Sequence, residues 1–537
     1  MKRLICNGKI YVERGRFAQA LYVEDGVIRA VGSNEEMAAA AGAGAEALDC
    51  GGRTVIPGLN DSHMHLLMVG MGLAQVNIAG VTSIGEMVER VKRFMAERPQ
   101  ACRRGIHSVG WNQDLFTGEK RMPNRHDLDK ISTEIPIVLE RVCGHAVSAN
   151  TKAIEMLGLG RNSPQYEGGT FELEADGYPS GIFTENACGR INSVIPGYTP
   201  EEYERMFLEA MDYAVAHGIT SVQSNDVGTS AADGRAVFSL VNRVFAEGRA
   251  KLRYHHQLCF RTVGEFQQYL DGGYGALCGH PWLSGGTLKL FKDGSLGART
   301  ALMRHEYLDD RGNFGVEVTG AALMDQFCAL ADKAGIQVVT HVIGDKAVED
   351  TVAAYEKVFR GGKNPLRHGL IHCQITDRPL LERIVKDGIP VFYQPIFLDY
   401  DMHAVISRCG EALSSTSYAF RTVEDLGGSV SYGTDSPVED CNPFPNIYSA
   451  VTRKDKTGYP EGGFFPQECV DVFSAVDAYT AGSAYAEFRE KDKGRLKPGY
   501  AADLAVLDRD IFTCDPMEIR GILPVLTMVG GNVVYKK

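Results

Sequence analysis

Two histidines separated by one residue are the first feature of this chain that could perform chemistry. His63 and His65 lie in VIPGLNDSHMHL, residues 55–66. Because residues i and i+2 of an extended chain point to the same side, both imidazoles can face one point in space. Imidazole binds zinc and neighbouring transition metals, and a metal with an open position can support hydrolysis. A lone His-x-His is also common among ordinary solvated side chains, so further ligands must decide.

Four more residues of suitable type follow apolar runs farther along the chain. They are Lys289 in GTLKLFKDG, His341 in VVTHV, His372 in GLIHC and Asp435 in SYGTDSPV. One such residue alone would be an ordinary buried histidine or a helix cap. Five strand ends that all supply such residues favour a shared site, because functional side chains of parallel barrels gather at the C-terminal ends of strands.

Lys289 requires a separate argument because an ammonium group cannot bind a metal. It shares a strand face with Thr287 and Phe291, whereas Leu288 and Leu290 lie on the opposite face. The outer face of a barrel strand packs against helices and should carry the leucines, which turns Lys289 inward. An unpaired inward cation is costly. The amine must therefore be neutral, paired with an aspartate in a buried salt bridge, or converted to a carbamate, and the sequence leaves these alternatives open.

The elements that must position these residues alternate between strand and helix. The eight candidate strands are Thr54–Gly58, Ile219–Ser224, Lys251–Gln257, Gly286–Phe291, Ile336–His341, Gly369–His372, Pro390–Gln394 and Gly428–Gly433. Amphipathic segments of helix length lie between most of them, for example Thr199–His217, Ala232–Gly248, Ala321–Ala334, Lys346–Phe359, Asp377–Lys386 and Val470–Tyr479. Alternation predicts a parallel sheet, and eight units close a barrel. We therefore predict an α/β fold, a (β/α)8 TIM-like barrel over residues 58–489.

Both ends of the chain contain short strands joined by tight turns, such as Asn7-Gly8 and Asp25-Gly26. Neither end has enough strands to bury a sheet face alone, so we predict that residues 1–57 and 490–537 form one small β-sandwich. Roughly 160 residues separate the first two barrel strands, more than one crossover helix needs. We therefore predict an insertion at about 70–198, placed where it could cover a substrate.

Composition limits the partners and the compartment. The 537 residues are 44% hydrophobic and 23% charged, as in ordinary globular proteins, and their net charge of −12 argues against nucleic acid or an anionic membrane as the main partner. We find neither an apolar run long enough for a membrane span nor the apolar core of a signal peptide. Thirteen scattered cysteines fit reduced thiols. We expect a cytoplasmic protein with a small-molecule substrate, and a homo-oligomer is left open.

Taken together, HMH, LKLFKDGSLGART, THVIGDKAV, GLIHCQ and GTDSPVED resemble the metal-dependent amidohydrolase superfamily. The resemblance is to its amidohydrolase-3 branch, which includes N-substituted formamide deformylase-like proteins. It spans nearly the whole chain, because GRLKPGYAADLAVLDRD at 494–510 is similar to the C-terminal β segment of that branch. The resemblance implies the same barrel and β-sandwich. It also implies hydrolysis of a non-peptide C–N bond in an amide, an N-formyl compound or a cyclic amide.

The resemblance further implies a role for each residue of the set. It implies that His63 and His65 bind one metal, that His341 and His372 bind a second, and that a carboxylated Lys289 bridges the two. Asp435 would be both a ligand and the catalytic acid/base. The expected cofactor is a divalent metal, with zinc favoured and one or two ions present.

Four other residues have weaker claims. His145 and Trp111 resemble the substrate region of the branch, although a polar loop and a core position account for them equally well. Asp293 and Asp61 could orient ligands, and Asp61 could instead be a turn residue. Two other functions are left open. One is a catalytically inactive barrel that serves as a binding or assembly protein, and the other is a metal-dependent lyase or isomerase on the same site.

Overall fold

A computed structural model describes residues 1–230 and 232–537 of the chain. These residues divide into two compact units. The larger consists of Met1–Val69 and Leu208–Lys537, and the smaller is Gly70–Phe207. Within residues 1–230 and 232–537, no helix combines the length and apolar character that crossing a membrane would require.

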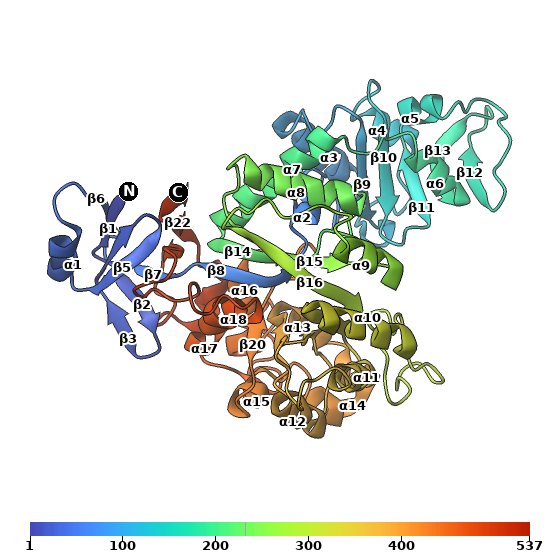
Figure 1. The fold of residues 1–537 in the computed structure, drawn as a ribbon. Coiled ribbons are helices and arrows are strands. Elements are labelled where there is room, and N and C mark those ends of the chain that lie inside the picture. Colours follow the sequence, from blue (N-terminus) through green and yellow to red (C-terminus); the bar gives the residue numbers. More distant parts are fainter. Residues whose placement is uncertain (231) are drawn as a thin grey trace. The chain divides into compact units, whose positions relative to one another are not determined.

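The larger unit is built on a sheet of eight parallel strands that curves into a barrel (Figure 1). In sheet order the strands are β8 (Leu59–Met64), β14 (Ile219–Ser224), β15 (Arg253–Cys259), β16 (Leu283–Phe291), β17 (Val338–Val342), β18 (Gly369–His372), β19 (Val391–Tyr393) and β20 (Val430–Tyr432). Seven of them overlap the predicted strands. The predicted α/β barrel is therefore confirmed.

The first predicted barrel strand was placed one strand too early. Thr54–Pro57 forms β7, which pairs with strands of the terminal β region, and the barrel begins at β8. Gly58 lies between the two strands, where a Cβ atom would be 2.1 Å from the Thr220 hydroxyl. The polar run Asn60–His63 resembles a loop in sequence. It is nevertheless a buried strand, in which Asn60 Nδ2, the Asp61 carboxylate and His63 Nδ1 each have a hydrogen-bond partner on another element.

The first and last strands of the sheet, β8 and β20, lead into segments that are hydrogen-bonded to each other at the candidate site. The Asp435 amide donates to the His63 carbonyl at 2.8 Å, and the His65 amide donates to the Ser436 carbonyl at 2.8 Å. The Asp61 carboxylate also accepts a hydrogen bond from the Thr434 hydroxyl at 2.6 Å. These bonds nearly close the barrel and hold the segments that follow its first and last strands together.

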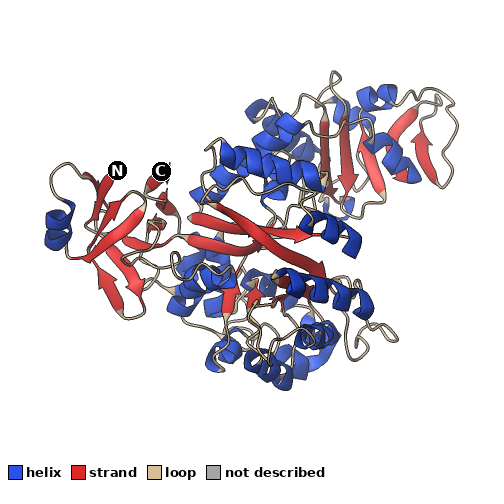
Figure 2. Cartoon of the chain, in the orientation of Figure 1, coloured by secondary structure: helices blue, strands red, loops and turns tan. Residues whose placement is uncertain are grey.

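Helices follow most of the barrel strands, as Figure 2 shows in blue around the red strands. In α10, the buried side chains Met324, Phe327, Cys328 and Ala331 recur at the spacing of one helical face. The α-helices between β14 and β21 are α8 (Gly234–Ala246), α9 (Val263–Leu270), α10 (Ala321–Ala334), α11 (Asp345–Glu356), α12 (Arg378–Lys386), α13 (Leu398–Asp401), α14 (Val405–Ser415), α15 (Phe420–Asp425), α16 (Pro443–Thr452), α17 (Val472–Asp477) and α18 (Ser483–Ala486). Two helices, α2 (Leu66–Leu73) and α7 (Pro200–Ala216), include a boundary between the units.

Strands from both chain ends share one sheet in the terminal β region. Its strands are β3 (Arg16–Ala18), β2 (Lys9–Glu13), β7, β21 (Leu504–Leu507), β22 (Pro524–Val529) and β23 (Asn532–Lys536). A second sheet contains β5 (Val27–Gly32), β4 (Ala20–Glu24), β1 (Lys2–Cys6) and β6 (Glu46–Asp49), and α1 (Asn34–Ala41) follows β5. Ile5 and Leu21 of the second sheet pack with Val55 and Leu504 of the first in one apolar core.

The smaller unit is the insertion, and it extends to Phe207 rather than to about residue 198. Its five-stranded sheet has the order β12 (Gly169–Leu173), β13 (Pro179–Glu185), β11 (Ala146–Ala149), β10 (Ile137–Arg141) and β9 (Ile106–Trp111). Its remaining α-helices are α3 (Ile84–Glu97), α4 (Arg125–Asp129), α5 (Thr151–Met156) and α6 (Asn186–Asn192). Two apolar clusters give this unit a core of its own.

Candidate metal centre

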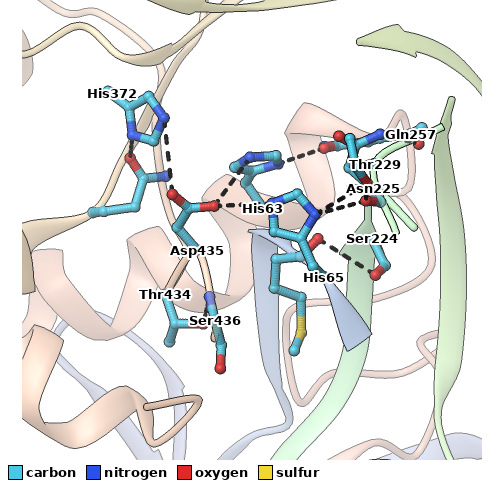
Figure 3. Close-up of polar contacts among 12 residues, drawn as sticks. His63, His65, Ser224, Asn225, Thr229, Gln257, His372, Thr434, Asp435 and Ser436 are labelled. Atoms are coloured by element: carbon cyan, nitrogen blue, oxygen red, sulfur yellow. Dashed lines mark hydrogen bonds and ion pairs between the residues drawn. The ribbon is translucent and has the colours of Figure 1, made fainter. Parts of the chain in front are cut away.

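Three imidazoles converge on one carboxylate at the C-terminal end of the barrel (Figure 3). The Nε2 atoms of His63 and His65 lie 3.4 and 3.3 Å from Asp435 Oδ1. The Nε2 atom of His372 lies 4.0 Å from Asp435 Oδ2. All four side chains are buried. Three strand ends that are far apart in sequence thus supply a single cluster of donor atoms.

The other ring nitrogen of each imidazole faces an oxygen acceptor. The Nδ1 contacts are His63 to Gln257 Oε1 at 2.6 Å, His65 to the Asn225 carbonyl at 2.6 Å and His372 to Gln394 Oε1 at 2.7 Å. Since an oxygen acceptor requires a proton on Nδ1, the neutral form of each imidazole presents an unprotonated Nε2 to the cluster, and that nitrogen could bind a metal. Sequence reasoning missed these three partners. Two of them, Gln257 and Gln394, are amide side chains on or just after strands that supply no ligand, but the sequence does not distinguish them from other polar residues, and the third is a backbone carbonyl.

His341 has the opposite arrangement. Its Nε2 contacts the Gly294 carbonyl at 2.9 Å, and its ring centroid lies 4.5 Å from that of His372. Because a carbonyl oxygen can only accept, Nε2 carries the proton and Nδ1 is the nitrogen with a free lone pair. His341 would therefore bind a metal through Nδ1, whereas the other three histidines would bind through Nε2.

The backbone is strained at two of these residues. His372 has φ 71° and Asp435 has φ 54°, in the left-handed region that side chains other than glycine rarely adopt. Such conformations cost of order 1–3 kcal/mol and persist where the surroundings impose them, often at functional sites. At Asp435 the hydrogen bond from its backbone amide to the His63 carbonyl helps to impose the turn.

Burial and mutual contacts set the charges. Burial lowers the pKa of His372 to about 4 and lowers the pKa values of His63 and His341 well below the usual range. His65 is the exception, because its hydrogen bond to the Asp435 carboxylate outweighs burial and raises its pKa, so a metal would have to displace its Nε2 proton. Burial alone would raise the pKa of Asp435, but the hydrogen bond from His65 and the neighbouring imidazoles outweigh it and hold that pKa below its usual range. An ionised carboxylate and neutral imidazoles are the forms that bind metals.

Lys289 is a buried amine in β16, and its Nζ has no hydrogen-bond partner among the described residues. It lies 3.8 Å from the centroid of the Phe291 ring. Burial lowers the pKa of Lys289 to about 8. The neighbouring Lys292 is also buried, but its Nζ donates to Glu317 Oε1 and to the Thr319 carbonyl. Lys292 therefore forms a salt bridge, whereas Lys289 Nζ has neither a salt bridge nor a hydrogen-bond partner among the described residues.

The donor set fits a divalent metal. One donor atom from each of His63, His372 and Asp435 can be chosen so that all lie within 4.8 Å of one another. His65 Nε2 contacts the same carboxylate. Imidazole nitrogen and carboxylate oxygen suit zinc, iron, manganese or nickel.

Asp61 and Asp293 order the backbone beside the candidate ligands. Asp61 accepts from the His63 amide at 3.2 Å and from Thr434, the residue before Asp435. Asp293 accepts from the Ile343 and Gly344 amides at 3.0 and 2.8 Å, two and three residues after His341. Burial raises the pKa of each carboxyl to about 7.

The two substrate candidates of the insertion have different environments. His145 is exposed, and its Nδ1 lies 3.0 Å from Glu185 Oε2. Trp111 is fully buried in an apolar cluster of the insertion, and its indole N–H donates to the Leu139 carbonyl at 2.8 Å. Trp111 is therefore a core residue of the insertion, and we do not include it among the substrate-binding residues.

Comparison with known proteins identifies the family of this chain. The family model described as "Amidohydrolase family" matches residues 46–535. The chain belongs to the amidohydrolase family. This membership confirms the resemblance drawn from the five motifs.

Relatives of similar length support the same assignment. The putative amidohydrolase YtcJ of Bacillus subtilis is 31% identical, and the match covers 100% of both chains. The N-substituted formamide deformylase of Arthrobacter pascens is 26% identical over 98% of this chain and 96% of its own. The crystal structure of an uncharacterized metal-dependent hydrolase from Pyrococcus furiosus has a TM-score of 0.75 and 28% identity, over 96% of this chain and 100% of that one. Family and relatives together support a metal-dependent hydrolase.

Proposed function

We propose that this protein hydrolyses a non-peptide C–N bond of a small molecule, in an amide, an N-formyl compound or a cyclic amide. The observation that carries the proposal is the buried Asp435 carboxylate, held against three imidazoles whose protons lie on the far nitrogen. An A. pascens relative that is named as a formamide deformylase supports this bond type.

In this proposal His63, His65 and Asp435 would hold a divalent metal, with zinc favoured, and His341 and His372 would hold a second ion. Such metals supply Lewis acidity and lower the pKa of water. The unpartnered amine of Lys289 supports a carbamate that would bridge the two ions.

The free state of all thirteen cysteines, each within the described residues, fits the expected cytoplasmic location.

Asp435 moves the proton. Its low pKa keeps the carboxylate ionised at neutral pH, as a general base must be. It accepts a proton from the attacking water as the new C–O bond forms. It then returns that proton to the departing nitrogen as the C–N bond breaks, so that a carboxylic acid and an amine leave.

The Asp435→Asn variant tests this role. The amide keeps an oxygen that can contact a metal but cannot accept the proton, so we expect bound metal to be retained and turnover to fall at least a hundredfold, the usual contribution of a general acid/base. Metal content is measured on the purified protein, and turnover on a panel of N-formyl and N-acyl amines. Retained turnover would remove Asp435 from this role.

The alternative of an inactive binding or assembly protein makes a different forecast for the wild-type chain. Metal analysis after expression in medium supplemented with zinc, iron and manganese would then find no stoichiometric metal. A lyase or isomerase would bind metal but release no amine from the panel. We favour the hydrolase because all six candidate positions of the site are occupied by suitable residues.

A further inference from the structure

Gln394 follows β19, and its side-chain amide uses its oxygen but not its nitrogen in hydrogen bonds. Its Oε1 accepts from Nδ1 of His372 at 2.7 Å. The side chain is only 2% exposed, and its Nε2 has no hydrogen-bond partner among the described residues. Two N–H groups are therefore buried next to a candidate ligand without an acceptor.

Gln257 is the matched case within the same site. Its Oε1 likewise accepts from Nδ1 of a ligand, His63, at 2.6 Å, and the residue is 1% exposed. Its Nε2, however, donates to the Ser62 carbonyl at 3.0 Å. The two glutamines thus hold two histidines in the same tautomer, and only Gln394 keeps its amino group free.

The alternative orientation of the Gln394 amide, with oxygen and nitrogen exchanged, does not give Nε2 an acceptor. Nε2 of His372 faces Asp435 and must be unprotonated to bind a metal there, which places the proton of the neutral ring on Nδ1. Rotation of the amide would then place an N–H group against an N–H group and lose the bond to the imidazole. A buried donor without an acceptor is destabilising, and most such donors in folded proteins have a partner. A ligand oxygen at the centre would supply the missing acceptor.

We propose that Nε2 of Gln394 donates a hydrogen bond to the acyl oxygen of the bound substrate and to the carboxylate product. This inference rests on the proposed function, because it assumes that the bound molecule carries such an oxygen. It assigns two functions to one side chain, in which Oε1 orients His372 and Nε2 contacts the substrate.

Two substitutions separate these functions. Gln394→Glu keeps an oxygen for Nδ1 of His372 but has no donor, whereas Gln394→Met removes both. We expect the glutamate variant to retain its metal and to bind acetate and neutral acetamide about ten- to a hundredfold more weakly than the wild type, the usual effect of losing such a bond. We expect the methionine variant to lose metal affinity as well.

Acetamide serves as the control for charge. If Gln394→Glu weakened acetate alone, repulsion between carboxylates would explain the loss and the proposed bond would be excluded. Binding is measured by calorimetry on metal-loaded protein, so the result does not depend on turnover.

The side-chain amide signals of the glutamines give a second readout. With 15N-labelled glutamine, we expect the Gln394 amide signal to shift on addition of acetate or acetamide and the Gln257 signal to stay in place. Signals are assigned with Gln394→Glu and Gln257→Glu. Unchanged signals and unchanged affinities in Gln394→Glu would overturn the proposal, since they would mean that water or another protein group satisfies Nε2. If the wild type binds both probes through Gln394 but hydrolyses no C–N bond, only the proposed function fails.

Discussion

At the scale of single residues, the site depends on which proton each group holds. His63, His65 and His372 donate from Nδ1, whereas His341 donates from Nε2. Asp435 is ionised because the imidazoles outweigh its burial. Lys289 is the exception, since its Nζ has no hydrogen-bond partner among the described residues and burial is the largest influence on its pKa. Burial lowers its pKa to about 8, so the amine is still mostly protonated at neutral pH, but its neutral fraction of roughly a tenth is far larger than that of an ordinary lysine.

A neutral amine can react with carbon dioxide, and this leads to a prediction for Lys289. The nitrogen forms a bond to carbon and releases a proton, which gives a carbamate. We expect metal-loaded protein incubated with 13C-bicarbonate to show a carbamate carbon signal that is absent from Lys289→Met, and we expect the variant to hold one metal where the wild type holds two. The signal is measured by 13C NMR and the metal by elemental analysis. An equal signal in Lys289→Met would show that another amine reacts.

At the scale of elements, the contact between β8 and β20 determines whether the ligands meet. Gly433 follows β20, and a Cβ atom there would lie 2.6 Å from the His63 amide nitrogen and 2.9 Å from the His63 carbonyl oxygen. These are backbone atoms of a buried strand, which cannot move aside independently. A side chain at this position would therefore push the segment with Asp435 away from His63.

We predict that Gly433→Ala lowers the free energy of unfolding by about 1–3 kcal/mol, as overpacking usually does. Metal affinity should fall as well, because the distance from Asp435 to His63 increases. Gly462→Ala is the matched control, since a Cβ atom there would meet no heavy atom within 4 Å. Urea unfolding and metal titration measure the two effects. If Gly433→Ala bound metal as tightly as the control, the contact between the two segments would be irrelevant to the site.

At the scale of the whole molecule, a buried ion pair links the barrel to the terminal β region. Arg253 of β15 contacts Asp503, the residue before β21, at 2.6 and 3.0 Å. The two side chains are 8% and 6% exposed. Arg14, which follows β2, forms a similar pair with Asp471, but these side chains are about half exposed. An Arg–Asp ion pair thus joins the barrel to the terminal β region twice, once buried and once exposed to solvent.

We predict a large difference between Arg253→Gln and Arg14→Gln. The first leaves Asp503 buried without its cation and should lower the free energy of unfolding by about 3–5 kcal/mol. The second should cost less than about 1 kcal/mol, because solvent screens an exposed pair. Urea unfolding followed by circular dichroism compares the two variants. Equal effects would indicate that the terminal β region does not depend on the buried pair.

The local pattern of the chain was sufficient for the barrel and for the candidate ligands. Apolar runs, helix-length amphipathic segments and hairpin signals are properties of neighbouring residues, so the α/β barrel could be predicted from them. The error at the first strand also has a local cause. The polar Asn60–His63 segment resembles a loop until its hydrogen-bond partners on other elements are known.

Only the tertiary structure revealed the partners of those ligands and their protonation. Gln257 and Gln394 are 194 and 22 residues from the histidines they orient. No local pattern distinguishes such an amide from any other polar residue at a strand end. The free Nε2 of Gln394 and the unpartnered Nζ of Lys289 are likewise visible only once every neighbour is placed. The types of ligand are a property of the sequence, whereas proton positions depend on burial and contacts that folding creates.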